Sequence, residues 1–239
     1  MTEPLLQVED AVKRFGGRVA LDGAHCAVPQ GSITGMIGPN GSGKSTLFNC
    51  IAGADTLDGG AVYLRGERID RLAPHTICER GVARTFQLTR LFRDMTVLEN
   101  LVAVAHSFND RQAVERAMRA LDLLEIPELM HRPASDLSYG QRKLVEIGRT
   151  LMLEPRLMLL DEPFAGINPR LQNRIVGYLQ KLRDEGMTLF IIDHEMRIIL
   201  DVCDSVWVLA EGRIVMNGPP ASVRSDPRVI EAYFSEPPC

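Results

Sequence analysis

The stretch from Gly38 to Thr46 constrains this chain of 239 residues more than any other part of it. Its residues, Gly-Pro-Asn-Gly-Ser-Gly-Lys-Ser-Thr, satisfy the pattern G-x-x-x-x-G-K-[ST]. The apolar run Ser32 to Ile37 before it predicts a buried strand, and the amphipathic run Lys44 to Ala52 predicts a helix. With average glycine usage, the pattern matches by chance in roughly one chain in a hundred of this length. We therefore expect a phosphate-binding loop, rather than a glycine-rich turn that only caps a helix.

The residue types in this loop suit a polyphosphate. Glycines at 38, 41 and 43 let the backbone turn tightly, so that successive N–H groups and the positive end of the following helix face an anion. Lys44 supplies a point charge for the outer phosphates, and the Ser45 hydroxyl is placed to hold a magnesium ion. The loop therefore predicts a nucleoside triphosphate as ligand.

Composition indicates an ordinary globular protein. Apolar residues make up 45% of the chain, enough for one large α/β domain or for a core with a smaller lobe. The net charge of −4 does not suit non-specific nucleic-acid binding, so no nucleic-acid partner is expected. We expect neither a membrane span nor export, because the apolar runs are short and no secretory signal starts the chain. The five cysteines are scattered without a C-x-x-C pair, which favours reduced thiols over disulfides or a zinc site.

Short β-rich runs before the loop predict hairpin-linked strands at Leu5 to Phe15 and Ala24 to Val28. Phe15 ends the first of these strands. An aromatic side chain there could stack on a nucleobase or belong to the core, and its sequence context alone favours the core.

The middle of the chain predicts strands and then a block of helices. A strand over Ala61 to Leu64 and a helix over Pro74 to Arg80 lead to a strand over Val82 to Gln87, whose final amide could reach a metal ion. Val97 to Phe108 and Asp110 to Leu124 then show helical periodicity and predict an all-helical insertion. Its charged faces suit a partner surface or plain solvation, and solvation is the commoner case.

A capping box begins the next predicted helix. In Leu-Ser-Tyr-Gly-Gln, residues 137–141, Ser138 is the N-cap and Gln141 follows three residues later. Gly140 would allow a second phosphate to approach this helix N-terminus closely. On sequence grounds alone the segment is also simply a good helix start.

Two further strand ends carry ionisable side chains. Leu157 to Leu160 predicts a central parallel strand that ends on Asp161 and Glu162, at the edge where a ligand crevice forms. Asp161 could hold magnesium there, and Glu162 could polarise an attacking water. A second buried strand, Thr188 to Ile192, delivers His194, although a lone histidine at a strand end is more often structural.

The rest of the chain predicts alternating helices and strands. A helix follows Asn168-Pro169, and strands are expected over Ser205 to Leu209 and Arg213 to Asn217. A short helix is expected over Asp226 to Phe234.

In this order, the phosphate loop, Gln87, residues 137–141, Asp161-Glu162 and His194 resemble the motifs of the nucleotide-binding subunit of ATP-binding cassette (ABC) transporters, across essentially the whole chain. The resemblance implies an α/β fold of the P-loop NTPase class, with a RecA-like core, an antiparallel β-subdomain and a helical subdomain. It also implies that residues 1–86 and 156–239 form the core and the β-subdomain. Residues 87–155 would form the helical signature subdomain.

The resemblance also implies roles for individual residues. Phe15 is similar to the adenine-stacking aromatic, which reverses the preference for the core given above. Glu162 resembles the catalytic glutamate, and His194 resembles the switch histidine that touches the γ-phosphate of ATP. Ser138 and Gly140 match the signature motif, which in this family covers ATP bound to a second subunit. The resemblance assigns magnesium to Ser45, Gln87 and Asp161, and the phosphates to Asn40, Gly41, Ser42, Gly43, Lys44, Ser45 and Thr46.

Several segments narrow the resemblance to importers of branched-chain amino acids and related amides. They are Ala-Arg-Thr-Phe-Gln at 83–87, Leu-Phe-Arg-Asp-Met-Thr-Val-Leu-Glu-Asn at 91–100, Pro-Phe-Ala-Gly-Ile-Asn-Pro at 163–169 and Val-Ile-Glu-Ala-Tyr at 229–233, with Tyr139 and Asn168. The segment 106–132 is shorter than is usual in that group.

The resemblance implies an ATPase subunit that is peripheral to the cytoplasmic face of the inner membrane. It would dimerise with a second cassette, identical or different, and work with transmembrane permeases and, indirectly, with a periplasmic binding protein. These partners would select the cargo. Two alternatives stay open: a soluble ABC ATPase in translation or DNA maintenance, and the ATPase of a lipid or lipopolysaccharide exporter.

Overall fold

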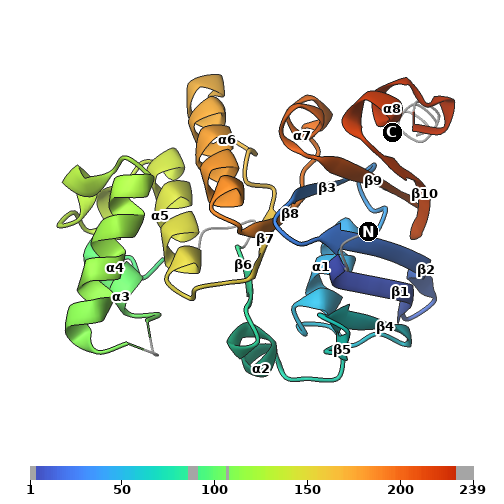
Figure 1. Ribbon diagram of the computed structural model, residues 1–239, viewed down its shortest axis with the longest axis horizontal. Coiled ribbons are helices and arrows are strands. Elements are labelled where there is room, and N and C mark those ends of the chain that lie inside the picture. The colour runs from blue at the N-terminus through green and yellow to red at the C-terminus, as the bar shows by residue number, and fades with distance from the viewer. Residues whose placement is uncertain (1–3, 86–90, 106–107, 230–239) are drawn as a thin grey trace.

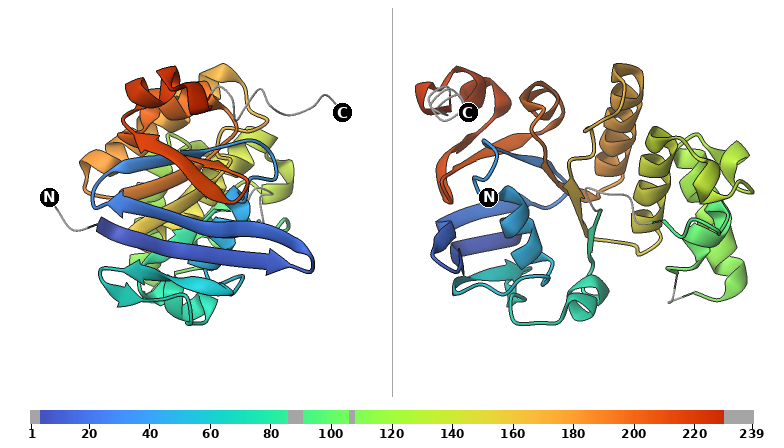
Figure 2. Two further views of the ribbon diagram at one scale, coloured as in Figure 1. Left: turned by 90° about the vertical axis from the view of Figure 1, so that its right-hand side faces the viewer. Right: turned by 180° about the vertical axis from the view of Figure 1, so that it is seen from behind.

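Two β-sheets and the helices around them form the structure, a computed structural model that describes residues 4–85, 91–105 and 108–229. Figure 1 shows a group of helices at one end of the molecule, the smaller sheet at the other end, and the larger sheet between them. Figure 2 shows the same order from behind. No helix within the described ranges is long and apolar enough to cross a membrane.

The larger sheet consists of β3 (Ile33–Ile37), β6 (Val82–Arg84), β7 (Leu157–Asp161), β8 (Thr188–Ile192), β9 (Ser205–Ala210) and β10 (Arg213–Gly218). Their order is β10-β9-β3-β8-β7-β6, and all neighbours pair in parallel except β10, which runs antiparallel to β9. β3, β7 and β8 are buried along their whole length. This burial on both faces explains why their sequences are almost continuous apolar runs.

The smaller sheet is antiparallel and consists of β1 (Pro4–Phe15), β2 (Arg18–Pro29), β4 (Gly59–Leu64) and β5 (Glu67–Arg68). Their order is β2-β1-β4-β5. The β1–β2 hairpin shifts register at several places, and such bulges increase the twist of a strand pair. The indole N–H of Trp207 on β9 donates to the Ala27 carbonyl on β2 at 3.2 Å, which links the two sheets.

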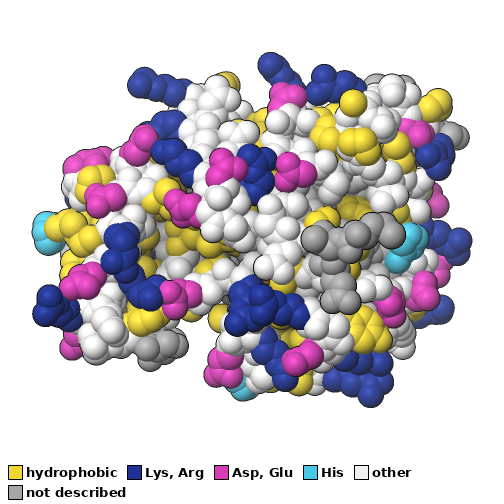
Figure 3. Space-filling view, viewed as in Figure 1, with side chains coloured by type: hydrophobic (Ala, Val, Ile, Leu, Met, Phe, Trp, Pro, Cys, Tyr) yellow, Lys and Arg dark blue, Asp and Glu magenta, His cyan; other side chains and the backbone are white. Residues whose placement is uncertain are grey.

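The helices are α1 (Lys44–Ile51), α2 (Pro74–Glu79), α3 (Val97–Val102), α4 (Asp110–Leu123), α5 (Tyr139–Leu151), α6 (Pro169–Asp184), α7 (Met196–Val202) and α8 (Pro220–Ser225), with 3-10 turns at Pro127–Leu129 and Ala134–Asp136. In the described part of residues 91–151, all the regular secondary structure is helical. Basic and acidic side chains are interspersed over the face in Figure 3, so no large area of one sign dominates that face.

Alternation along the central strands divides the core in two. Met158 and Leu160 of β7 join the cluster that includes α5, α6 and the helical end, whereas Leu157 and Leu159 join the cluster around α1 and the smaller sheet. The rings of Phe48 on α1 and Phe190 on β8 lie 5.0 Å apart in the second cluster. Because both faces are packed, the larger sheet is a rigid platform for whatever lies at its edges.

Most of the predicted strands and helices are confirmed, with differences at their ends. β2 begins at Arg18, well before the predicted strand, because the tight turn at Gly16-Gly17 lets the hairpin start directly after β1. The predicted helix over Val97 to Phe108 ends at Val102: Val104 and Ala105 make i→i−3 bonds in place of the helical ladder, and residues 106–107 lie outside the described part. The strand predicted over residues 82–87 is confirmed over 82–84, while residues 86 and 87 lie outside the described part.

Some predictions lie outside the described residues. Gln87 is one of them, and so are residues 230–234 of the last predicted helix. The short helix α8 was not predicted.

Buried thiols give the first testable prediction. Burial raises the pKa of Cys26 and of Cys50 to about 12, and raises the pKa of Cys203 as well. We expect maleimide at about pH 8 to leave these thiols unmodified in the native protein, because almost none of each is thiolate, while the half-buried Cys78 reacts faster than these three. Peptide mass spectrometry measures the labelling, and the denatured protein is the control. Labelling of Cys26 as fast as Cys78 in the native state would contradict this prediction.

Candidate functional site

Close backbone contacts fix the shape of the glycine-rich loop between β3 and α1. A Cβ atom at Gly38 would overlap the carbonyl oxygen of Leu209 on β9. At Gly43, where φ is 109°, a Cβ would overlap the carbonyl oxygen of Ala20 on β2. Only glycine fits both places, because the loop is pressed against strands of both sheets.

The side chain of the loop lysine is hydrogen-bonded to the backbone of the loop itself. Lys44 is buried, and its Nζ donates to the carbonyl oxygens of Gly38 at 2.7 Å and Pro39 at 2.9 Å. Ser42 is buried too, and its Oγ has no hydrogen-bond partner among the described residues. The loop therefore keeps a folded shape in which a positive charge and an unsatisfied hydroxyl lie close to the backbone turn.

A cavity of about 370 Å³ opens beside this loop. Phe15 lies at its wall with 48% of its surface exposed, so it is not a core residue. Lys13 Nζ lies 5.2 Å from the centroid of the Phe15 ring. The cavity is lined by Phe15, Arg18, Ala20, Asn40, Gly41, Gly43, Lys44, Ser45, Thr46 and Glu162. The structure thus brings eight residues of the predicted site together at one hollow.

The two acids at the end of β7 are held in different ways. Asp161 is buried, its N–H donates to Thr85 Oγ1 at 3.1 Å, and its Oδ2 accepts a bond from Arg84 Nη2 at 2.7 Å. Glu162 has a left-handed φ of 48°, which is unusual for a residue with a side chain. Its N–H donates to the Ile192 carbonyl on β8 at 2.8 Å, so the neighbouring strand holds this turn.

His194 follows β8 and lies near the second of these acids. Its Nδ1 is 3.8 Å from Glu162 Oε2 and 3.5 Å from Asp193 Oδ1, and half of the side chain is exposed. Asp193 is fully buried, and burial raises the pKa of its carboxyl group. Its oxygens accept the N–H groups of Phe164 and Glu195 at 3.1 and 3.0 Å. His194 is therefore an exposed neighbour of Glu162, positioned by a buried turn.

The signature segment begins α5 as predicted but does not line the cavity by the loop. Ser138 is the N-cap, and its side chain exchanges hydrogen bonds with Gln141 as a capping box. A Cβ atom at Gly140 would overlap the side chain of Leu171 on α6, so helix packing alone already requires glycine there. Ser138 and Gly140 are thus not among the residues that line the cavity beside the phosphate loop, and neither are Ser42, Asp161 and His194.

Sequence reasoning missed two cations near the acids. Arg84 was noted only within a family segment, and Lys143 was not noted at all. Lys143 is 4% exposed and donates from Nζ to the Glu162 carbonyl, and its burial lowers the pKa of its ammonium group. Its position two residues after a capping box gave no signal, because the sequence does not show which strand end a helix side chain meets.

The donor set near the loop suits a hard divalent cation. Asp161 Oδ1 is buried and has no hydrogen-bond partner among the described residues, and Ser45 supplies a hydroxyl at the wall of the cavity. Magnesium prefers such oxygen ligands. These two residues fit the predicted magnesium site, whereas Gln87, its third predicted ligand, lies outside the described residues.

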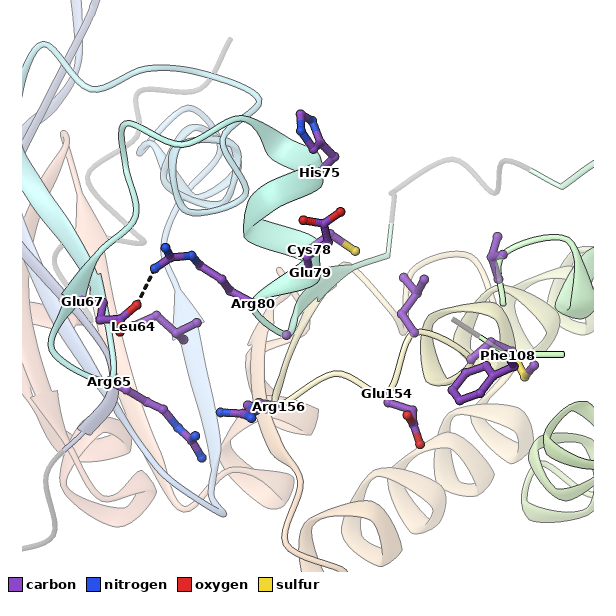
Figure 4. A pocket seen from close by; sticks show the side chains of 14 residues that line it. Leu64, Arg65, Glu67, His75, Cys78, Glu79, Arg80, Phe108, Glu154 and Arg156 are labelled. Atoms are coloured by element: carbon purple, nitrogen blue, oxygen red, sulfur yellow. Dashed lines mark hydrogen bonds and ion pairs between the residues drawn. The ribbon is translucent and has the colours of Figure 1, made fainter. Parts of the chain in front are cut away.

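A larger cavity of about 980 Å³ lies elsewhere, between the β4–β5 hairpin, α2 and the residues that follow α3 and α5 (Figure 4). In Figure 4, Arg65 and Arg156 lie toward one side of it, while Glu154 and Phe108 lie on the opposite side. Arg80 and Glu67 form an ion pair at 2.5 Å at its wall. None of the described residues predicted for the site lines this cavity.

Comparison with known proteins identifies the family. The family model described as "ABC transporter" matches residues 21–165, more than half of the chain. The chain belongs to the ABC transporter family of ATP-binding cassettes. A second model, described as "Branched-chain amino acid ATP-binding cassette transporter", matches residues 213–234.

Relatives match over almost the whole cassette. The high-affinity branched-chain amino acid transport ATP-binding protein BraF of Pseudomonas aeruginosa is 37% identical, over 99% of this chain and 100% of BraF. The protein LivG of Escherichia coli K12 is named for the same transport, and it is 36% identical over 99% of this chain and 100% of LivG. The probable LivG of Methanocaldococcus jannaschii is 39% identical over 98% of this chain and 99% of that protein. The BraF alignment spans 254 positions against 239 residues here, so BraF carries residues that this cassette lacks.

Solved structures agree with this. A crystal structure of the ADP conformation of an ATP-binding cassette of an ABC transporter has a TM-score of 0.90 and 38% identity, covering 98% of this chain and 100% of that chain. A nucleotide-free cassette has a TM-score of 0.89 at the same identity and coverage. The predicted family and the predicted α/β cassette fold are therefore confirmed.

The buried lysine gives a prediction of its own. Lys143→Met keeps the length of the side chain but removes its charge and its bond to the Glu162 carbonyl. Because Glu146, Glu162 and Asp193 attract the ammonium group, we expect the free energy of unfolding to fall by about 2 kcal/mol. Urea denaturation followed by circular dichroism measures the change. The exposed Lys181→Met on α6 is the matched control, expected within about 0.5 kcal/mol of the parent. An unchanged midpoint for Lys143→Met would contradict its role as a buried counter-charge.

Proposed function

We propose that this cassette is the ATP-hydrolysing subunit of an importer of branched-chain amino acids or related amino acids and amides. One observation carries the proposal: the loop residues Lys44 and Ser45 line the same cavity as Glu162, in a chain whose relatives are named for branched-chain amino acid transport. The two alternatives, a soluble ATPase of translation or DNA maintenance and a lipid exporter, are not favoured, because the relatives match end to end.

The cavity suggests how ATP is bound. Phe15 offers an exposed ring for adenine, and the backbone of residues 40–46 with the N-terminus of α1 offers amides for the phosphates. Lys44 exchanges its carbonyl partners for the outer phosphates. Ser45, Asp161 and Gln87 would hold magnesium, which would supply positive charge against the phosphates.

Hydrolysis is assigned to Glu162 with His194 beside it. Glu162 lines the cavity, and its carboxylate can accept a proton from a water aimed at the γ-phosphate. His194 Nδ1, 3.8 Å away, can hold the carboxylate or contact the γ-phosphate. The backbone of Glu162 is fixed by Ile192 and Lys143, which limits the motion of its side chain.

A second cassette, identical or different, completes each site in this proposal. The N-terminus of α5 is exposed, does not line the cavity of its own chain, and carries Ser138 and Gly140. A helix N-terminus favours an anion such as the γ-phosphate of ATP bound to a partner subunit. Two ATP molecules would then be sandwiched between two cassettes.

Transport requires permeases, which we place at the helical end. Residues 87–155 would act as the helical signature subdomain, and residues 1–86 with 156–239 as the core and β-subdomain. The large cavity between these parts supports a contact there, because its lining combines arginines and glutamates with apolar residues. The cassette would sit at the cytoplasmic face of the inner membrane, and a periplasmic binding protein would supply cargo from the other side. The residues absent relative to BraF are predicted to fall within 106–132.

Glu162→Gln tests the catalytic assignment. The amide cannot accept a proton, so we expect ATP turnover to fall by at least about a hundredfold while ATP binding persists and an ATP-bound dimer accumulates. Phosphate release and size-exclusion chromatography with ATP measure both effects. The exposed Glu185→Gln is the control and should turn over like the parent. Turnover of Glu162→Gln at the parent rate would show that another group is the base.

Lys44→Ala tests the phosphate cradle. Removing the only loop ammonium should abolish measurable ATP binding, because the outer phosphates lose their point charge. Isothermal titration calorimetry reports the affinity, and thermal unfolding shows whether the variant folds. Lys181→Ala, on the surface of α6, should bind ATP as the parent does. An unchanged affinity for Lys44→Ala would remove the basis of the assigned nucleotide site.

A further inference from the structure

Arg84 ends the edge strand β6, and its side chain is directed to the acid at the end of the neighbouring strand. Its Nη2 lies 2.7 Å from Asp161 Oδ2, and the two side chains are only 11% and 5% exposed. Its Nη1 donates to Asn49 Oδ1 on α1 at 2.6 Å, and the guanidinium carbon lies 6.0 Å from the centroid of the Phe48 ring. The cation is therefore fixed by the scaffold and does not depend on a bound ligand for its position.

The two oxygens of Asp161 have different surroundings. Oδ2 is bonded to Arg84, while Oδ1 is buried and has no hydrogen-bond partner among the described residues. A buried carboxylate is costly unless a positive charge lies beside it, and Arg84 supplies that charge. Oδ1 is then the atom left for a second cation.

We propose that Arg84 is a built-in counter-ion that shares Asp161 with the bound magnesium ion, so that each of the two cations weakens the other's hold on this carboxylate. The inference rests on the proposed function, because it takes Asp161 as a magnesium ligand. It adds a residue that lowers the affinity of the site for magnesium without being one of the metal's ligands. Arg84 does not line the nucleotide cavity.

Electrostatics gives the sign of the effect. Two cations on one carboxylate repel each other, and the repulsion is only weakly screened where both side chains are buried. The coupling is reciprocal, so removing Arg84 must tighten magnesium binding by the factor with which magnesium loosens Arg84. Without nucleotide, the same removal leaves a buried charge uncompensated and destabilises the protein.

The arrangement has a consequence for turnover. If magnesium left with the products, the buried Asp161 carboxylate would lose one of its two cations. Because Arg84 remains on Oδ2, the nucleotide-free site keeps a paired charge. Arg84 therefore lowers the cost of emptying the site and limits how tightly the metal is held.

Arg84→Met tests this proposal, because it removes the charge and both hydrogen bonds but keeps an unbranched apolar side chain. Arg84→Lys keeps a charge, and Arg80→Met, which removes an exposed pair with Glu67, is the matched control. Calorimetry gives the ADP affinity of each protein with and without Mg²⁺, and thermal unfolding gives the stability without nucleotide.

We expect Arg84→Met to bind ADP alone within about twofold of the parent and to gain at least about fivefold more ADP affinity from Mg²⁺ than the parent gains. Its melting temperature without nucleotide should fall, and Arg84→Lys should lie between it and the parent. Arg80→Met should show the parent's gain. An equal or smaller gain for Arg84→Met would overturn the proposal, because Arg84 would then only orient Asp161 or support the fold.

Two further outcomes keep the test decisive. If Arg84→Met does not fold, the same titration is made on Arg84→Gln, which also removes the positive charge beside Asp161 but keeps a polar side chain. Its Mg²⁺ gain should also exceed that of the parent, and an equal gain would overturn the proposal. If the parent itself gains nothing from Mg²⁺, the magnesium assignment of the proposed function fails, and the inference about Arg84 fails with it.

Discussion

The aligned ends of the parallel strands are the constraint on which the rest of the structure depends. In the register of the larger sheet, Met36 of β3 and Asp161 of β7 both lie beside Ile192 of β8. The glycine-rich loop, the second acid and the histidine turn therefore leave the sheet at one edge, although they are far apart in the sequence. A slip of one residue in β7 would turn Asp161 to the opposite face and separate these groups.

Each buried charge at this edge has a partner that the protein itself supplies. The ammonium groups of Lys44 and Lys143 bond to backbone carbonyls, Asp161 pairs with Arg84, and Asp193 accepts two backbone N–H groups. These partners make the burial tolerable without a ligand. They also differ in kind: the carbonyl partners of Lys44 can give way to phosphates, whereas the bonds of Asp193 lie within a turn and only hold it in shape.

The sequence predicted the parts of the site that short-range patterns encode. The glycine-lysine loop, the apolar strand before Asp161 and the capping box at Ser138 each combine a residue pattern with a local structure, and local structure follows from nearby residues. The pattern could not give the partner of Arg84, because the pairing of β6 with β7 joins segments separated by the whole helical insertion. For the same reason it could not show that Lys143 reaches the Glu162 carbonyl, or that Gly140 is required by Leu171. The early end of α3 was missed because apolar spacing continues past Val102 while the backbone hydrogen bonds tighten.

Helix α5 connects the helical end of the molecule to the chemistry at the edge of the sheet. Its N-terminus is exposed at Ser138, and a little more than one turn later Lys143 bonds to the backbone of Glu162. The ring of Tyr139, in the same first turn, lies 5.6 Å from Lys143 Nζ and packs against Gly166, which follows the acidic pair. An α-helix moves nearly as a rigid rod, so a displacement at its N-terminus must also displace Lys143. Since the turn of Glu162 has a left-handed φ and depends on this bond and on Ile192, a force on the exposed end of α5 acts directly on the residue assigned to hydrolysis.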